Sequence, residues 1–181
     1  MNLDLSFWTK ASARRKRIYS AMFVFMVALI ILAIGSSIPI SSQTAKGIYN
    51  QLNQTVSQNQ ASGTLTQYIF LNNFRICLIF FIPVFGPLVG VISFVTTGYA
   101  IGAESQVLGL PPILYVFLEL LSPVFWIEFT AYSIAITESI WLFRRLMQKR
   151  IWELKNTLIL IGVCAALLAV GAVIESMLPL I

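Results

Sequence analysis

The sequence predicts an all-α, polytopic helical membrane protein with about five transmembrane helices and one short re-entrant or interfacial helix. Hydrophobic residues make up 58% of the 181 residues and charged residues only 10%, so there is too little polar surface for a water-soluble domain. The apolar stretches lack the alternation of a membrane β-barrel, and helices then satisfy the backbone in lipid. We expect one membrane domain over residues 1–181.

Residues 1–17 are expected to form a basic cytoplasmic tail, because they end in four consecutive Arg and Lys residues at positions 14–17. The apolar stretch 18–38 follows directly and is long enough to cross a bilayer, which takes about 20 residues. Positive charge beside a membrane helix favours the cytoplasmic side, so this span starts inside. A cleavable signal peptide is the second interpretation of the stretch.

Residues 39–64 are rich in Gln, Asn, Ser and Thr and contain a single charged residue, Lys46, so we expect an external polar loop. Apolar residues recur every four positions from Ile48 to Val56, which predicts a short helix in its middle. Asn53 begins a glycosylation sequon, which has meaning only in a glycosylating compartment.

Two further transmembrane helices are expected at 65–82 and 88–105, separated by a turn that contains Pro83 and Pro87. The second helix and the turn before it carry glycines at multiples of four residues, a pattern typical of close helix packing. These are Gly86, Gly90, Gly98 and Gly102. In an alternative topology, residues 65–105 form a re-entrant hairpin and only three spans cross the membrane.

The stretch 111–121 reaches only about 16 Å as a helix, so we expect a re-entrant or interfacial piece. Pro123 suits the first turn of the next helix, which spans 123–143, and we also expect it to take part in helix packing. Residues 144–155 form a second basic, cytoplasmic segment, and 156–178 form the last span. That span has its own row of small residues, Gly162, Ala165, Ala166, Ala169 and Ala172.

The distribution of positive charge sets the orientation. Of the twelve basic residues, five lie in 1–17 and five in 144–155, while Lys46 lies in the polar loop and Arg75 in a helix. Because basic segments stay in the cytoplasm, both should lie on that side, with an odd number of crossings between them. The N-terminus is then cytoplasmic and the C-terminus external in a multi-pass protein of the cell membrane.

Helix 123–143 contains two carboxylates, Glu128 and Glu138. An ionised side chain at the centre of a membrane helix costs about 2.5–3.5 kcal/mol, so such residues usually face a protein interior and have a partner. On a helical wheel Glu128 shares its face with Ala131 and Ala135, which we expect to pack against another helix.

Asn72, Asn73 and Arg75 lie within helix 65–82 and are expected to complete a polar membrane core with Glu128 and Glu138. We expect Arg75 to pair with Glu128, since the depths of the two residues in their helices are similar and an arginine fork satisfies a carboxylate. The favoured role of the carboxylates is that of struts that orient helices. The alternative is an ion or proton route in a permease or channel subunit.

Catalysis is not expected. The sequence has no histidine, its one aspartate is Asp4, and Cys77 and Cys164 lie in apolar stretches without a disulfide framework or redox motif. We therefore expect no catalytic residues, no metal, no cofactor and no enzymatic activity. The basic cluster at 14–17 is explained by topology and by contact with anionic lipid rather than by nucleic acid.

Three segments resemble the stage II sporulation protein M family. They are Phe70-Leu71-Asn72-Asn73-Phe74-Arg75, Gly98-Tyr99-Ala100-Ile101-Gly102, and Pro123 followed by Glu128 and Ala131. Their order and spacing match the family over about residues 68–142, although Thr97 and Val124-Phe125 depart from its motifs. The resemblance implies a non-enzymatic membrane scaffold or assembly subunit. We expect it to act in the lipid bilayer with a protein partner or as a homo-oligomer, and not with nucleic acid.

Overall fold

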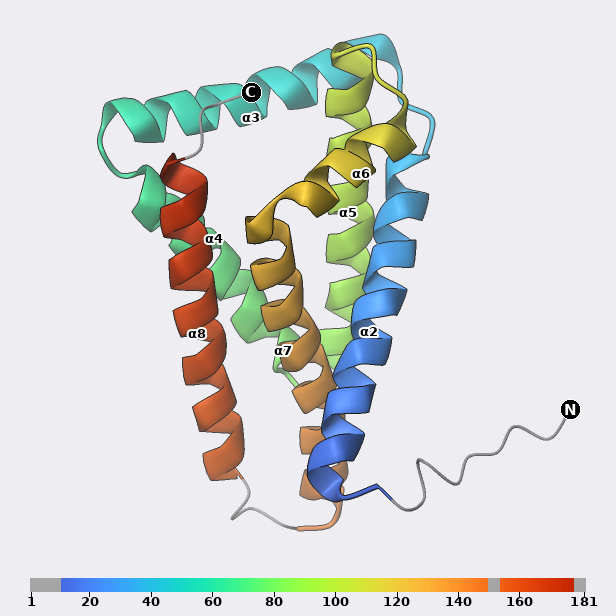
Figure 1. Ribbon diagram of the computed structural model, residues 1–181, viewed down its shortest axis with the longest axis vertical. Coiled ribbons are helices and arrows are strands. Elements are labelled where there is room, and N and C mark those ends of the chain that lie inside the picture. The colour runs from blue at the N-terminus through green and yellow to red at the C-terminus, as the bar shows by residue number, and fades with distance from the viewer. Residues whose placement is uncertain (1–10, 150–153, 178–181) are drawn as a thin grey trace, which may run out of the picture.

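The computed structural model describes residues 11–149 and 154–177, and the elements in this part of the chain are all helices (Figure 1). The all-α class expected from the sequence is therefore confirmed. The helices are α2 (Ala13–Ser36), α3 (Ser42–Ala61), α4 (Leu65–Phe80), α5 (Phe85–Val107), α6 (Pro112–Leu121), α7 (Pro123–Met147) and α8 (Leu154–Met177).

Three of these helices, α2, α5 and α8, are long and apolar enough to cross a membrane. Helices α6 and α7 make a fourth candidate if they count as one span, bent by 89° at Ser122. Helix α4 has 16 residues, or about 24 Å, which is shorter than the apolar layer of about 30 Å. By length and composition the described residues thus contain three or four spans, fewer than the five expected.

The first basic segment is helical rather than part of a tail. Helix α2 begins at Ala13, and the side chain of its N-cap, Ser12, accepts a hydrogen bond from the backbone N–H of Arg15 at 3.4 Å. Residues 14–17 therefore form the first turn of the spanning helix itself. Residues 1–10 of the expected tail lie outside the described residues.

The second basic segment also begins inside a helix, since α7 continues through Arg144 and Arg145 to Met147. Residues 144–147 of the expected loop at 144–155 are therefore helical. Residues 150–153 lie outside the described part of the chain. Lys16 and Arg17 of α2 line one hollow together with Arg144 and Arg145. The two basic segments thus meet at one end of the bundle, which we call the basic end.

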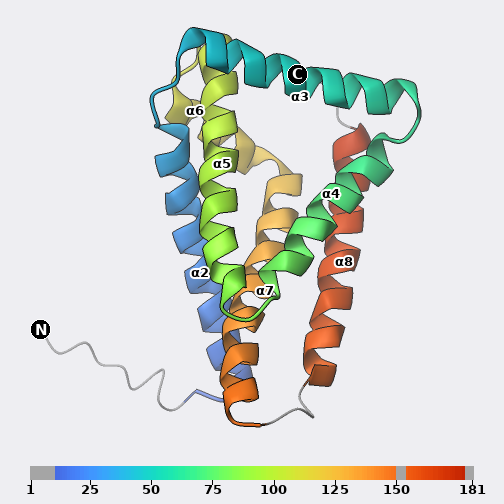
Figure 2. The ribbon, with the colours of Figure 1, turned by 180° about the vertical axis from the view of Figure 1, so that it is seen from behind.

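The expected external loop is mostly a helix, so that expectation was wrong in extent. Helix α3 covers 20 residues and lies across the end of the bundle opposite to the basic end (Figures 1 and 2). The side chain of its N-cap, Ser41, accepts a hydrogen bond from the backbone N–H of Thr44 at 3.1 Å. Ala45, in the first turn of α3, is fully buried against the bundle. Asn53 of the sequon is exposed on this helix. We call this the α3 end.

Helices α2 and α5 approach each other through small residues, as the glycine spacing predicts. A Cβ atom on Gly102 would lie 2.5 Å from the carbonyl oxygen of Ser36, and one on Gly98 would overlap the carbonyl oxygen of Leu32. From the other side, a Cβ on Gly35 would lie 2.6 Å from the carbonyl oxygen of Val95. Neither helix has room here for a side chain, so backbone packs directly on backbone.

Gly90 of α5 serves a different contact. A Cβ atom there would lie 2.6 Å from Cδ1 of Ile136, so this glycine receives a side chain of α7. Glycines of the same row on α5 therefore pack against two neighbouring helices, α2 and α7.

The turn between α4 and α5 stops short of the basic end (Figure 2). The hydroxyl of Ser139 donates to the carbonyl oxygen of Ile82 in this turn at 2.7 Å. Ser139 lies eight residues before the end of α7 at Met147, or about 12 Å along the helix. Backbone that leaves a helix needs such partners for its polar groups, and Ser139 of α7 supplies one here.

Helix α8 packs through a row of residues that shares only Ala172 with the expected one. Its buried residues include Cys164, Leu168, Gly171 and Ala172, whereas Gly162 and Ala166 are exposed. The thiol of Cys164 donates to the carbonyl oxygen of Ala131 on α7 at 3.4 Å. Both cysteines are free and buried, which agrees with their apolar sequence context.

The contact of α2 with α5 predicts a strong effect of bulk at Gly98. Gly98→Leu should lower the melting temperature in detergent sharply, because overpacking usually costs about 1–3 kcal/mol and here the obstacle is backbone, which cannot move aside. Gly162→Leu on α8 is the matched control, since nothing lies within 4 Å of a Cβ atom there. Equal melting temperatures for the two variants would refute the contact.

Candidate functional site

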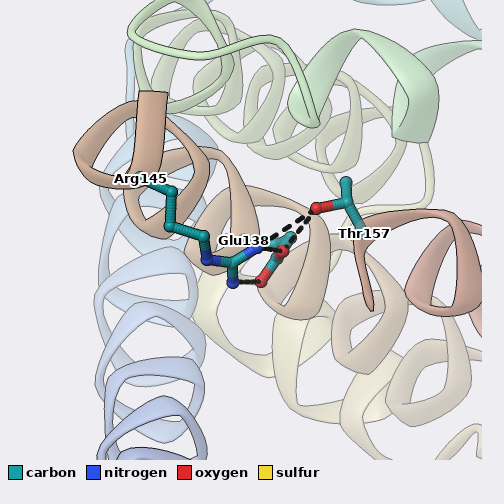
Figure 3. A network of polar contacts seen from close by, with 3 residues as sticks. All are labelled: Glu138, Arg145 and Thr157. Atoms are coloured by element: carbon teal, nitrogen blue, oxygen red, sulfur yellow. Dashed lines mark hydrogen bonds and ion pairs between the residues drawn. The ribbon is translucent and has the colours of Figure 1, made fainter. Parts of the chain in front are cut away.

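The most completely paired polar site inside the bundle surrounds Glu138. Its Oε1 atom lies 2.8 Å from Nη1 of Arg145, and its Oε2 accepts from Nη2 of the same guanidinium at 3.1 Å. Thr157 of α8 donates its hydroxyl to Oε1 at 2.7 Å (Figure 3). Glu138 is 1% exposed and Arg145 4% exposed, so this is a buried ion pair.

Helical geometry explains why Arg145 reaches back to Glu138. Residues seven apart lie two turns apart on nearly the same face, and helical side chains lean toward the N-terminus of their helix. Arg145 therefore points into the bundle instead of out to the aqueous side. Nη1 of Arg145 also donates to the Thr157 hydroxyl at 3.4 Å, which ties α7 to α8.

This arginine was missed in the sequence, where a basic run after an apolar stretch marks the end of a span. The available signal was the seven-residue spacing from Glu138 to Arg145. Removing a charge from water without pairing it is expensive, so the buried carboxylate requires a nearby cation. Arg145 is the residue that meets this requirement.

The second carboxylate, Glu128, has a partner other than the expected one. The side-chain amide of Asn73 on α4 donates to Oε1 of Glu128, and Asn72 donates to Oδ1 of Asn73 at 3.4 Å. Arg75 is exposed. The expected pair of Arg75 with Glu128 is therefore wrong, and a chain of amides takes its place.

The orientation of α4 gives the reason. Ile69 and Cys77 are buried and lie four residues before and after Asn73, so Asn73 is on the packed face. Arg75 is two residues further on, which places it about 200° around the helix from Asn73. The expected pair of Arg75 with Glu128 was based on depth in the membrane, and depth does not determine which face of α4 a residue lies on.

The face that Glu128 shares with small residues packs as expected. Ala131 and Ala135 are both fully buried. Gly171 of α8 lies close by, since a Cβ atom on it would be 3.8 Å from Cγ of Glu128. Small residues on α7 and α8 thus let these two helices approach near the carboxylate.

Pro123 itself is exposed, so it marks a helix start and is not a packing residue. It opens α7 just after Ser122, where the chain turns by 89° from α6. Trp126 holds this bend, since its indole N–H donates to the carbonyl oxygen of Leu120 at 2.7 Å.

Among the described residues, no group of three or more His, Cys, Asp or Glu side chains could hold a metal ion. Several polar groups of the bundle are bound to one another. Examples are Glu138 with Arg145 and Thr157, Glu128 with Asn73, and Ser139 with the turn at Ile82. Their chemistry is that of hydrogen-bonded links between helices.

The model of the stage II sporulation protein M family matches residues 20–178. The chain belongs to this family. Comparisons with curated proteins and with solved structures gave no match. Two of the segments that carry the family resemblance touch directly, because Asn73 belongs to the first and Glu128 to the third. The second segment contains Gly98 and Gly102, which form the contact with α2.

The buried pair predicts a characteristic pattern of stability. Glu138→Gln and Arg145→Met should each lower the melting temperature strongly, because breaking a buried pair costs about 3–5 kcal/mol, while the double variant should recover much of the loss. Arg144→Met is the matched control, since Arg144 is exposed one position earlier. Strictly additive losses in thermal melts would show that the two groups do not interact.

A parallel test separates Asn73 from Arg75. Asn73→Leu should destabilise the protein by about 1–3 kcal/mol, because it removes the amide that binds Glu128. Arg75→Met should not lower the melting temperature, since its side chain lies on the exposed face of α4. If Arg75→Met lowered the melting temperature and Glu128→Gln rescued that loss, the result would support the expected pair of Arg75 with Glu128.

Proposed function

We propose that this chain is a non-enzymatic, multi-pass membrane scaffold or assembly subunit of the stage II sporulation protein M family. The observation that carries the proposal is that each carboxylate within α7 is bound by at least one side chain of another helix, Thr157 of α8 or Asn73 of α4. Glu138 contacts Arg145 and Thr157, and Glu128 contacts Asn73. Such contacts fix the relative positions of α4, α7 and α8, which suits a rigid platform for other proteins.

Helix α3 supports a platform at the α3 end. It lies across the bundle and presents amides to the outside, with Lys46 as its one charged residue. Exposed amides on this helix are Gln43, Asn50, Gln51, Asn53, Gln54, Gln58 and Gln60. This uncharged, hydrogen-bonding surface suits a protein partner or a second copy of the chain, and it offers little to nucleic acid.

For the topology, we propose that the basic end is cytoplasmic and the α3 end external. Both basic segments lie together at one end, which agrees with the positive-inside rule. Helix α2, the bent pair α6–α7 and helix α8 then cross the membrane. Helix α5 is also long enough to cross, but it enters with α4 as a hairpin from the α3 end, because α4 is too short to cross. The N-terminus is cytoplasmic and the C-terminus external in both the three-span and the five-span arrangements.

A permease or channel subunit is the second candidate. The observation in its favour is a groove of about 670 Å³ at the basic end whose lining includes Glu138. In that case water would reach Glu138 and the face of Glu128 during function, and solute would pass between α7 and its neighbours.

Single-cysteine labelling distinguishes the candidates. After replacement of Cys77 and Cys164 by Ala, single cysteines are introduced by Gln54→Cys, Val84→Cys, Ala135→Cys and Gln148→Cys and treated with a membrane-impermeant maleimide. We expect labelling of position 54 only from outside and of position 148 only from inside. Positions 84 and 135 should react only after denaturation, which is also the control for thiol reactivity.

Several outcomes would contradict these proposals. Labelling of Ala135→Cys from either side would favour the permease, labelling of Val84→Cys from inside would favour five spans, and labelling of Gln54→Cys from inside would overturn the orientation. A scaffold must also hold a partner. Affinity purification of the full chain in mild detergent should retain one protein or a second copy, and a monomer without partners would count against the scaffold.

A further inference from the structure

The groove at the basic end lies between α2, α7 and α8 and changes character with depth. Near the start of α2 and of α8 its lining is polar, with Arg14, Arg17 and Asn156. Farther along these helices toward the membrane interior it is lined by apolar side chains. These are Ile18, Ala21, Ile134, Ile159 and Leu160.

A second hollow of about 300 Å³ adjoins the groove, because Arg17 and Ala13 line both. Its remaining lining residues are Lys16, Trp141, Arg144, Arg145 and Gln148. The guanidinium carbons of Arg17 and Arg144 each lie 5.8 Å from the ring centroid of Trp141. Arg17 thus stands where a cationic hollow meets an apolar groove.

Thr137 adds an independent observation. It is 4% exposed, it lines the groove, and its hydroxyl has no hydrogen-bond partner among the described residues. A buried hydroxyl usually has a partner, because leaving it unpaired costs free energy. A ligand that carries an oxygen acceptor below a charged group would supply this partner.

We propose that the groove binds one anionic phospholipid from the leaflet at the basic end. Its phosphate lies between Lys16, Arg17 and Arg144, an ester carbonyl accepts from Thr137, and one acyl chain follows the apolar walls between α2 and α8. Glu138 does not oppose this arrangement, since its charge is compensated by Arg145.

The chemistry of each part favours a lipid over a small anion. Guanidinium groups bind phosphate oxygens with paired hydrogen bonds, and basic pockets between membrane helices hold anionic headgroups. Tryptophan is favoured at the depth where headgroups meet the acyl layer. A free phosphate would contact the cationic groups, but it would not occupy the space between the apolar walls or reach the Thr137 hydroxyl.

Native mass spectrometry of the full chain in neutral detergent tests the site during titration with phosphatidylglycerol. We expect one tightly bound lipid, and Arg17→Gln should weaken its binding about tenfold or more, because a charge-assisted hydrogen bond is lost. Arg15→Gln is the matched control, since it removes the same charge from an exposed position on the same turn. It should change the affinity by less than about threefold.

Ala21→Phe provides a second variant that keeps every charge but fills the groove, and it should also abolish the tight lipid. Melting temperatures without lipid check that each variant is folded. Equal binding of phosphatidylcholine, equal losses in Arg15→Gln and Arg17→Gln, or unchanged binding in Ala21→Phe would each overturn the site. Displacement of the lipid by inorganic phosphate at the same concentration would show that the site binds a small anion.

Discussion

The structure depends on one constraint of the membrane interior, which is that lipid offers no hydrogen-bond partner to a polar group. A polar group placed at depth in these helices therefore needs a partner from the protein itself or from a bound ligand. Glu138 meets this need with Arg145 and Thr157, and the turn at Ile82 meets it with Ser139. These contacts decide how α4, α7 and α8 sit against one another.

Between apolar helices the driving force is different, because lipid tails compete equally well for an apolar side chain. Close packing then comes from small residues that let backbones touch. The contact of Gly98 and Gly102 with residues 32–36 joins α5 to α2, and α2 is otherwise exposed over much of its apolar length. The bundle is thus held by polar links on one side and by glycine contacts on the other.

The two ends of the bundle differ in chemistry, and this difference bears on function. The basic end gathers cations around Trp141 beside an apolar groove, whereas the α3 end carries a long helix of exposed amides. These two contrasting ends suit the proposed role, in which the protein binds lipid at one end and a partner at the other.

The sequence alone determined the helical class, the approximate bounds of most helices, the packing role of the glycines on α5, and the family. These follow from local features such as apolar length, prolines and residue spacing, which each segment carries by itself. The extent of α3 was missed, because a segment rich in Gln, Asn, Ser and Thr is typical of a loop. In the structure this segment is a helix, capped by Ser41 and packed on the bundle.

Only the tertiary structure decided the partners of the buried charges. Residue spacing placed Glu128 and Arg75 at similar depths, but the rotation of α4 about its axis turned Asn73 toward Glu128 and Arg75 away. Likewise, the sequence places Arg145 in a cytoplasmic segment. In the structure it is buried beside Glu138 and Thr157, and Thr157 comes from α8. Helix rotation is set by all of a helix's neighbours at once, and a single sequence does not contain that angle in any local pattern.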